Sequence, residues 1–151
     1  MRLSATLVVL SLSLAACHEA PTSPYKRPSG PAPTGLPVTL RITPSTRTPF
    51  AGPVIVTEGD SVTASAEFNV SGCLDYTPAA GTVGGAVVVT IIETAPTVPR
   101  MCALVKQRAV FHAVLRPAPR GSYAVVLRER MEWPTDGPVE REWARGSVAL
   151  P

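Results

Sequence analysis

The chain has 151 residues and a formal net charge of +3, with 17 prolines, 11 glycines and few aromatic side chains. This length allows one folded domain at most, once an export segment is set aside. The charge is too small to indicate nucleic acid, so no nucleic-acid partner is expected. Many β-branched residues separated by Pro and Gly favour short strands and turns over a helical bundle.

The first 16 residues are organised like an export signal. Arg2 supplies a positive charge, and residues 3–16 form an apolar stretch shorter than the roughly 20 residues of a membrane span. The sequence Leu14-Ala15-Ala16-Cys17 resembles the lipobox of bacterial lipoproteins. The resemblance implies that residues 1–16 are removed and that a diacylglyceryl group is attached to the Cys17 thiol. An ordinary signal peptide and an uncleaved anchor are the alternatives.

A lipid on Cys17 would make the membrane a covalent partner and the bacterial cell envelope the location, because two or three acyl chains anchor a protein stably. His18 follows the cysteine where an Asp is associated with inner-membrane retention. The resemblance therefore favours the outer membrane over the inner membrane in a cell that has both.

Residues 17–36 are predicted to be a lipidated, disordered, Pro-rich tether. The segment is too polar to bury a core, and its prolines favour extended polyproline II structure. At about 3.1 Å per residue it could hold a domain as far as about 60 Å from the lipid. The prolines are Pro21, Pro24, Pro28, Pro31 and Pro33.

Residues 37–151 are predicted to form one all-β domain, an antiparallel β-sandwich of six to seven strands. The first candidate strand, 37–43, ends at Pro44. The next two, 54–57 and 61–69, flank a turn at Glu58-Gly59-Asp60. Residues 61–69 alternate apolar and polar side chains, as half-buried strands do.

The later candidate strands include a more apolar one. Residues 82–94 contain the run VVVTII, which is typical of a strand buried on both faces, and residues 81–85, with glycines at 81, 84 and 85, are interpreted as a hairpin turn. Residues 103–115 could be drawn as a helix, but a strand is preferred because residues 109–115 are β-compatible throughout and Pro117 follows.

The last two candidate strands, 122–133 and 139–150, flank a turn rich in Pro and Gly. If Trp133 lies opposite Val139, Arg130 lies opposite Glu142 and can form a cross-strand ion pair with it. The charges at residues 140–142 are typical of an edge strand that is protected from aggregation.

The sequence LRPAPRGSYAVVL resembles a turn and strand of immunoglobulin-like and fibronectin-like domains. The matching residues are Leu115, Pro117, Pro119, Gly121, Tyr123 and Val125. The resemblance implies an immunoglobulin-like sandwich in which Tyr123 forms a tyrosine corner, with its hydroxyl bonded to nearby backbone. Val125 stands where antibody domains have a cysteine, so their inter-sheet disulfide is not expected.

If Cys17 is acylated, Cys73 and Cys102 remain as an even pair in an exported protein. Both lie at the ends of candidate strands, and we expect them to form a disulfide. Closing this loop would stabilise the fold by roughly 3–4 kcal/mol in the chain-entropy model. A metal-binding pair is disfavoured because C-x-x-C spacing is absent.

No catalytic, metal-binding or cofactor-binding constellation is predicted. His112 lies in a candidate strand, and a triad drawn with Asp75 and any serine lacks a supporting motif. His112 is therefore interpreted as a strand residue, and it is also the best-placed acid–base candidate if the protein is a hydrolase.

Acidic and basic residues occupy separate parts of the domain. Residues 48–99 hold five acids and no Lys or Arg, whereas residues 100–130 hold seven basic residues and one acid. The simpler interpretation pairs acidic with basic strands inside one sandwich. The alternative gives an anionic partner, such as a polysaccharide, lipid headgroup or acidic protein, a site on Lys106, Arg108, Arg116, Arg120, Arg128 and Arg130.

The leading hypothesis is a membrane-anchored, non-enzymatic β-sandwich that binds an envelope protein or polysaccharide or has a structural role in the envelope. Binding of an anionic partner through the basic strands ranks second, and a hydrolase-type enzyme ranks last. The ligand and the oligomeric state are not predicted.

Overall fold

A computed structural model of the chain describes residues 26–28, 30–45, 52–98, 101, 106–133 and 135–151. These residues contain eight strands and no helix, which confirms the all-β prediction and exceeds the expected six to seven strands. The strands are β1 (Val38–Pro44), β2 (Val54–Glu58), β3 (Ser61–Ser71), β4 (Asp75–Val83), β5 (Ala86–Thr94), β6 (Lys106–Leu115), β7 (Gly121–Met131) and β8 (Val139–Leu150).

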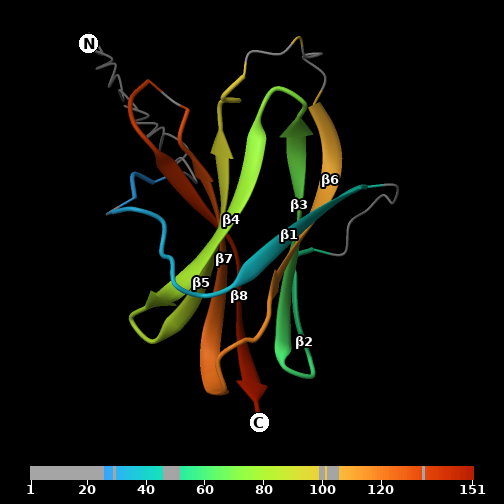
Figure 1. The fold of residues 1–151 in the computed structure, drawn as a ribbon, viewed down its shortest axis with the longest axis vertical. Coiled ribbons are helices and arrows are strands. Elements are labelled where there is room, and N and C mark those ends of the chain that lie inside the picture. Colours follow the sequence, from blue (N-terminus) through green and yellow to red (C-terminus); the bar gives the residue numbers. More distant parts are fainter. Residues whose placement is uncertain (1–25, 29, 46–51, 99–100, 102–105, 134) are drawn as a thin grey trace, which may run out of the picture.

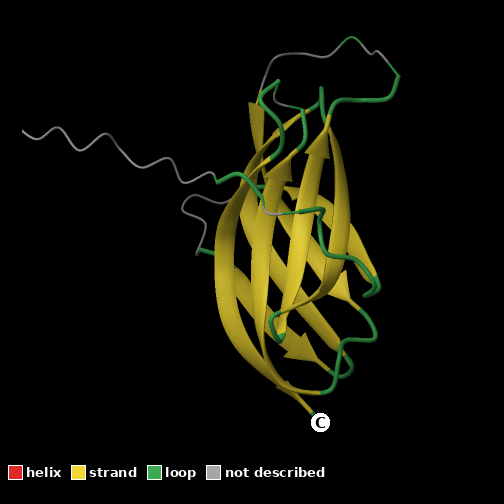
Figure 2. Cartoon of the chain, turned by 90° about the vertical axis from the view of Figure 1, so that its left-hand side faces the viewer, coloured by secondary structure: helices red, strands yellow, loops and turns green. Residues whose placement is uncertain are grey.

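The strands form two four-stranded sheets that pack face to face as a sandwich (Figures 1 and 2). The first sheet has the order β1-β6-β3-β2, and the second has the order β4-β5-β7-β8. The first sheet is antiparallel throughout, but β5 and β7 pair in parallel. The prediction of a purely antiparallel sandwich is therefore wrong at this pair. Between β5 and β7 the chain forms β6 in the opposite sheet, which lets β7 start in the direction of β5.

The extra strand is β4, which the sequence pattern did not predict. Pro78 and Gly81 interrupt its alternation, and both are tolerated because β4 is an edge strand. Candidate strand 82–94 is in fact divided between β4 and β5 at Gly84-Gly85, whose φ angles are 56° and 79°. The hairpin turn is confirmed at Gly84-Gly85, but residues 81–83 belong to β4 rather than to the turn. The strand interpretation of residues 106–115 is also confirmed, whereas residues 103–105 lie outside the described part of the chain.

The core lies between the sheets and is built from the inward side chains of both. Alternating positions of β3 are buried, and the run from Val87 to Ile91 in β5 is buried on both faces, as predicted. The largest fully buried side chain is Phe111, in β6. Its ring packs edge-on against Phe68 of β3 and Tyr76 of β4. The two sheets therefore share one continuous core.

The expected tyrosine corner does not form. The Tyr123 hydroxyl is buried, and within the described residues it has no hydrogen-bond partner. Its side chain packs against the core instead, and burial raises the pKa of the phenol.

An N-terminal strap, residues 26–28 and 30–36, lies along the second sheet. Lys26 and Glu140 exchange two backbone hydrogen bonds of 2.7 Å, and the Leu36 amide donates to the Ala80 carbonyl at 3.0 Å. The extended backbone of the strap thus finds hydrogen-bond partners on the sheet, whereas the tether over residues 17–36 stays a prediction. Residues 17–25 lie outside the described part.

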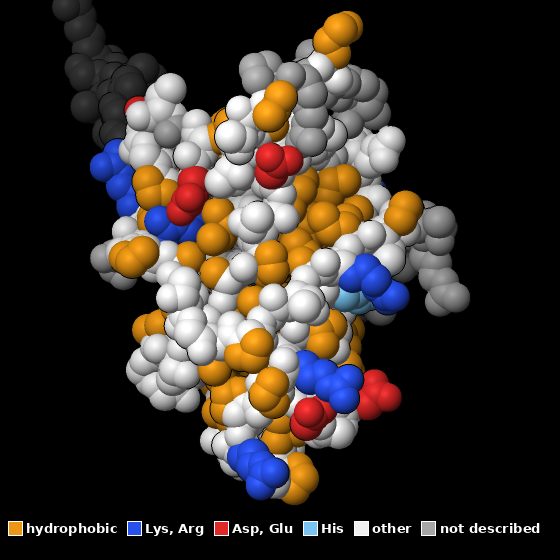
Figure 3. Space-filling view, viewed as in Figure 1, with side chains coloured by type: hydrophobic (Ala, Val, Ile, Leu, Met, Phe, Trp, Pro, Cys, Tyr) orange, Lys and Arg blue, Asp and Glu red, His pale blue; other side chains and the backbone are white. Residues whose placement is uncertain are grey.

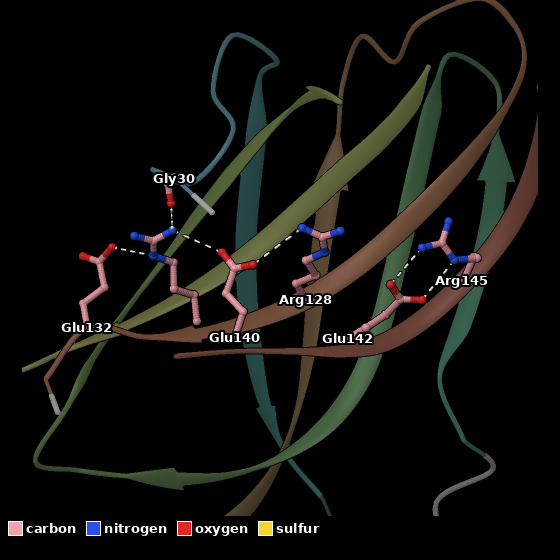
Figure 4. A network of polar contacts seen from close by, with 7 residues as sticks. Gly30, Arg128, Glu132, Glu140, Glu142 and Arg145 are labelled. Atoms are coloured by element: carbon pink, nitrogen blue, oxygen red, sulfur yellow. Dashed lines mark hydrogen bonds and ion pairs between the residues drawn. The ribbon is translucent and has the colours of Figure 1, made fainter. Parts of the chain in front are cut away.

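Arg130 ties the strap to the second sheet. Its side chain is only 7% exposed and donates to the Gly30 carbonyl at 2.6 Å, to Glu132 at 2.7 Å and to Glu140 at 3.1 Å (Figure 4). Arg128 approaches the other oxygen of Glu140 at 3.6 Å. Glu140 thus lies between two arginines at the start of β8.

The β7–β8 pairing differs from the predicted one. Met131 lies opposite Val139, and Arg130 lies opposite Glu140 rather than Glu142. The prediction is wrong because β7 ends at Met131, so Trp133 belongs to the connection rather than to the strand. The edge position predicted for the last strand is confirmed.

Candidate functional site

A cavity of about 440 Å³ opens at one end of the sandwich. It lies where β3, β5 and β7 end and where β6 and β8 begin. Apolar walls come from Met131, Trp133 and Trp143, and the polar groups that line it include Asn69 and Lys106. In Figure 1 this end is opposite the C-terminus.

Two nearly buried carboxyl groups, Glu93 and Glu129, lie at the inner side of this cavity. They are 5% and 6% exposed, respectively. Side chains alternate along a strand, so Glu93 shares the inward face of β5 with Val89 and Ile91. Glu129 follows Leu127 in the same way on β7. Both acids therefore stand where the core meets the cavity.

The two carboxyl groups influence each other electrostatically. Burial and, next, the negative charge of Glu129 raise the pKa of Glu93 from its ordinary value of 4.5 to about 7. A hydrogen bond from Trp133 and the positive charge of Lys106 act in the opposite direction. Below about pH 7 the pair thus offers an acidic proton and several acceptor lone pairs.

A β-bulge places Trp143 beside this carboxyl pair. The β7–β8 register shifts between Leu127, which faces Ala144, and Arg128, which faces Glu142. Trp143 is thus the extra residue, and its side chain packs inward against the core. Bulges redirect side chains in this way near functional sites.

The redirected indole makes three contacts that position the site. Its Nε1 donates to Oε2 of Glu129 at 3.0 Å. The guanidinium carbon of Arg141 lies 4.2 Å from the ring centroid, which is a cation–π contact. The ring also packs against Phe68 with centroids 4.5 Å apart.

Tyr76 on β4 lies opposite Glu93 on β5, and it also contacts the turn that follows β3. Its hydroxyl accepts a hydrogen bond from the Ser71 amide at 2.8 Å. Burial raises the pKa of the phenol, and the negative charges of Glu93 and Glu129 raise it further. The phenol therefore stays neutral beside the carboxyl pair.

In the described part of the chain, no three His, Cys, Asp or Glu side chains gather as they would around a metal ion. The carboxyl groups, the two indoles and the cationic side chains of the cavity thus offer hydrogen-bond acceptors, hydrogen-bond donors and apolar surface to a bound molecule.

The structure does not bring the six predicted basic residues together. Arg108 pairs with Glu67 on the outer face of the first sheet, and Arg116 pairs with Asp60 at 3.2 Å. Arg128 and Arg130 pair with acids near the strap on the second sheet. Of the six, Lys106 lines the cavity, and Arg120 lies in the connection before β7.

The surface view agrees with this dispersal. In Figure 3, Lys and Arg side chains lie at separate places rather than in one patch. The pairing of Arg108 with Glu67 joins a basic strand to an acidic one, as the simpler interpretation of the charge distribution predicts.

His112 lies on the outer face of the first sheet and is held by its neighbours. Ser65 Oγ lies 2.9 Å from Nδ1, and Thr43 Oγ1 lies 3.2 Å from Nε2. Burial and then the charge of Arg41 lower the pKa of the imidazole. Asp75 belongs to the other sheet, so the structure does not assemble the triad drawn from the sequence.

The predicted cysteine sites are only partly described. Cys73 lines the cavity, whereas Cys17 and Cys102 lie outside the described residues. Lipidation at Cys17 and the disulfide between Cys73 and Cys102 therefore stay predictions. No helix in the described ranges is long and apolar enough to cross a membrane.

Sequence reasoning missed the carboxyl pair, although a signal was present. In candidate strand 122–133, residues 123, 125, 127, 131 and 133 are apolar and alternate with their neighbours, and Glu129 has the same parity. A charge at an inward position is unusual enough to mark a candidate site. The bulge that redirects Trp143 has no comparable signal in the sequence.

The comparisons with known proteins add no relative. The chain matches no protein-family model, no curated protein and no solved structure.

Proposed function

We propose that the chain is a lipid-anchored, non-enzymatic binding module of the bacterial cell envelope, with the cavity as its ligand site. The lipobox resemblance at Leu14-Ala15-Ala16-Cys17 supports the anchor and the location. The observation that carries the binding role is the cavity itself. A nearly buried carboxyl pair stands there beside two indoles, in a space of the size that small-molecule sites have.

The burial of this carboxyl pair supports a functional role for it. Burying carboxyl groups costs several kcal/mol in general unless they are paired or neutralised, so apolar residues would stabilise the end of the core better. Groups with strongly perturbed pKa values in a cleft are candidates for functional sites.

The finer fold assignment belongs to the same proposal: the sandwich is immunoglobulin-like or fibronectin-like. Two face-to-face four-stranded sheets and the match from Leu115 to Val125 support it. The parallel β5–β7 pair and the missing hydrogen bond of Tyr123 are departures from the antibody pattern.

Binding of an anionic partner through the basic strands has weaker support. Four of the six residues are ion-paired within the domain, and they lie on different faces. If they nevertheless bind such a partner, the affinity falls steeply with added salt.

Fractionation of cells that express a Cys17→Ala variant tests the anchor. We expect the variant to leave the membrane fraction while its circular dichroism after purification stays that of a β protein. His18→Ala is the matched control, because it changes the next residue and keeps the thiol, and it should stay in the membrane fraction. A Cys17→Ala protein that stays membrane-bound would contradict the proposed anchor.

A further inference from the structure

The cavity has an apolar wall that a flat ligand can cover. Trp133 is 50% exposed and lines the cavity together with Glu93. A large aromatic side chain left half-exposed in a cavity costs hydrophobic free energy in the empty protein. A ligand with an apolar face of the size of the indole would recover that free energy.

The polar groups of the cavity are a mixture of donors and acceptors. The Glu93–Glu129 pair offers oxygens as acceptors and one proton, and the Asn69 amide both donates and accepts. Arg141 and Lys106 only donate. Hydroxyl groups donate and accept at once, so a ligand that carries several of them matches this set.

The charges of the cavity favour neither a cation nor an anion. Two cationic side chains, Lys106 and Arg141, line the cavity together with the two carboxyl groups. The attraction of an ionic ligand to the groups of opposite sign is offset by its repulsion from the groups of like sign. A neutral ligand needs no such balance, because it can hydrogen-bond to groups of both signs.

From these three features we propose that the cavity binds a neutral saccharide, with one ring stacked on Trp133 and its hydroxyl groups bonded to the Glu93–Glu129 pair. The proposal rests on the proposed binding function and names the ligand class of the same site. An aromatic face combined with a few convergent polar groups is the usual composition of a small-molecule site.

Titration of the detergent-solubilised full chain with neutral oligosaccharides tests the proposal. The probes are the trimers of N-acetylglucosamine, of β-1,4-linked glucose and of α-1,4-linked glucose, followed by calorimetry and tryptophan fluorescence. We expect saturable binding of at least one trimer. Trp133→Ala and Glu129→Gln should each weaken it by about tenfold or more.

Matched controls separate the site from general effects. Val56→Ala and Glu67→Gln change an exposed apolar residue and a carboxyl group on the outer face of the first sheet, and both should bind as the wild type does. Trp133→Phe keeps an aromatic face and should lose less affinity than Trp133→Ala. This variant also keeps the test decisive if the alanine variant folds poorly.

The charged probes tetramethylammonium and inorganic phosphate distinguish the remaining outcomes. Binding of either one that depends on Trp133 or Glu129, without saccharide binding, overturns the saccharide proposal and keeps the binding module. Failure of all three trimers at millimolar concentration overturns it as well, and so does trimer binding that Trp133→Ala leaves unchanged. Failure of the anchored module itself is seen separately, in the fractionation of Cys17→Ala.

Discussion

Glu93 is stable inside the sandwich because it keeps its proton. Its pKa of about 7 lies well above the ordinary value of 4.5, and burial is the main cause. Tyr76 lies opposite it on β4, the charge of Glu129 on β7 adds to the upward shift of its pKa, and Trp133 and Lys106 moderate that shift. The group is therefore neutral in mildly acidic solution and partly ionised at physiological pH.

This shift predicts how stability depends on pH. Between about pH 4.5 and pH 7 the folded state binds more protons at Glu93 than the unfolded state does, so the free energy of unfolding falls as pH rises through this window. The loss contributed by Glu93 is about 3 kcal/mol. A Glu93→Gln variant has no proton to lose, so it should be the more stable protein above pH 7.

Urea unfolding of both proteins from pH 4.5 to 8 measures this difference. Subtracting the two curves removes the contribution of groups that they share, such as His112 and Glu67, whose lowered pKa values give slopes of the opposite sign. Glu67→Gln is the matched control, because it should lose stability near neutral pH instead of gaining it. Parallel curves for wild type and Glu93→Gln would contradict the pKa assigned to Glu93.

At the residue scale, one of the two carboxyl groups of the candidate site could be predicted from the sequence. The parity of Glu129 along its strand indicates an inward carboxyl group. Its partner Glu93 comes from a different strand, and no local pattern says which strands become neighbours. The contact between them therefore depends on the parallel β5–β7 pair, which only the fold reveals.

At the scale of elements, the N-terminal strap and β4 depend on a close approach at Gly81. A Cβ atom at Gly81 would lie 2.4 Å from the carbonyl oxygen and 2.8 Å from the nitrogen of Thr34. Both are backbone atoms, which cannot rotate away as a side chain can. The absence of a side chain at Gly81 is thus what lets the strap lie flat on the sheet.

A Gly81→Ala variant should displace the strap from the sheet. We expect a loss of about 1–3 kcal/mol in the free energy of unfolding, typical of overpacking, and faster amide hydrogen exchange in residues 26–36. Hydrogen exchange followed by mass spectrometry measures the local effect. Gly146→Ala is the control, because its Cβ would meet the flexible end of the Ile55 side chain at 3.1 Å and should leave the strap protected. Unchanged exchange in Gly81→Ala would argue against the packed strap.

The sequence predicted elements better than it predicted their pairing. Alternation and breakers located most strands, because a half-buried strand must repeat every two residues. They missed β4, whose Pro78 and Gly81 resemble a loop, and they missed the strap, whose prolines resemble a tether. The alternation of side chains also could not predict the direction of a strand, since a period of two is the same in parallel and antiparallel pairs.

At the scale of the whole molecule, one aromatic cluster joins the sheets. Phe68 and Phe111 come from the first sheet, and Tyr76 and Trp143 come from the second. Ring centroids in the cluster are 4.5–5.2 Å apart. The same cluster underlies the cavity, because Trp143 contacts both Phe68 and Glu129. Stability of the sandwich and geometry of the candidate site therefore depend on shared side chains.

Truncation of Phe111, which is 1% exposed, should accordingly destabilise both sheets together. Phe111→Ala is expected to cost about 3–5 kcal/mol, a large part of the 5–15 kcal/mol typical of a folded domain, and Phe111→Leu should cost less. Urea unfolding followed by tryptophan fluorescence reports on the second sheet, and hydrogen exchange in β3 and β6 reports on the first. Both probes should show the same midpoint, shifted by the same amount.

Val56→Ala, at an exposed position of β2, is the control and should change the free energy of unfolding by less than about 0.5 kcal/mol. Because the rings interlock across the sheets, separate midpoints for the two sheets in the Phe111 variants would mean that the core is not one cooperative unit.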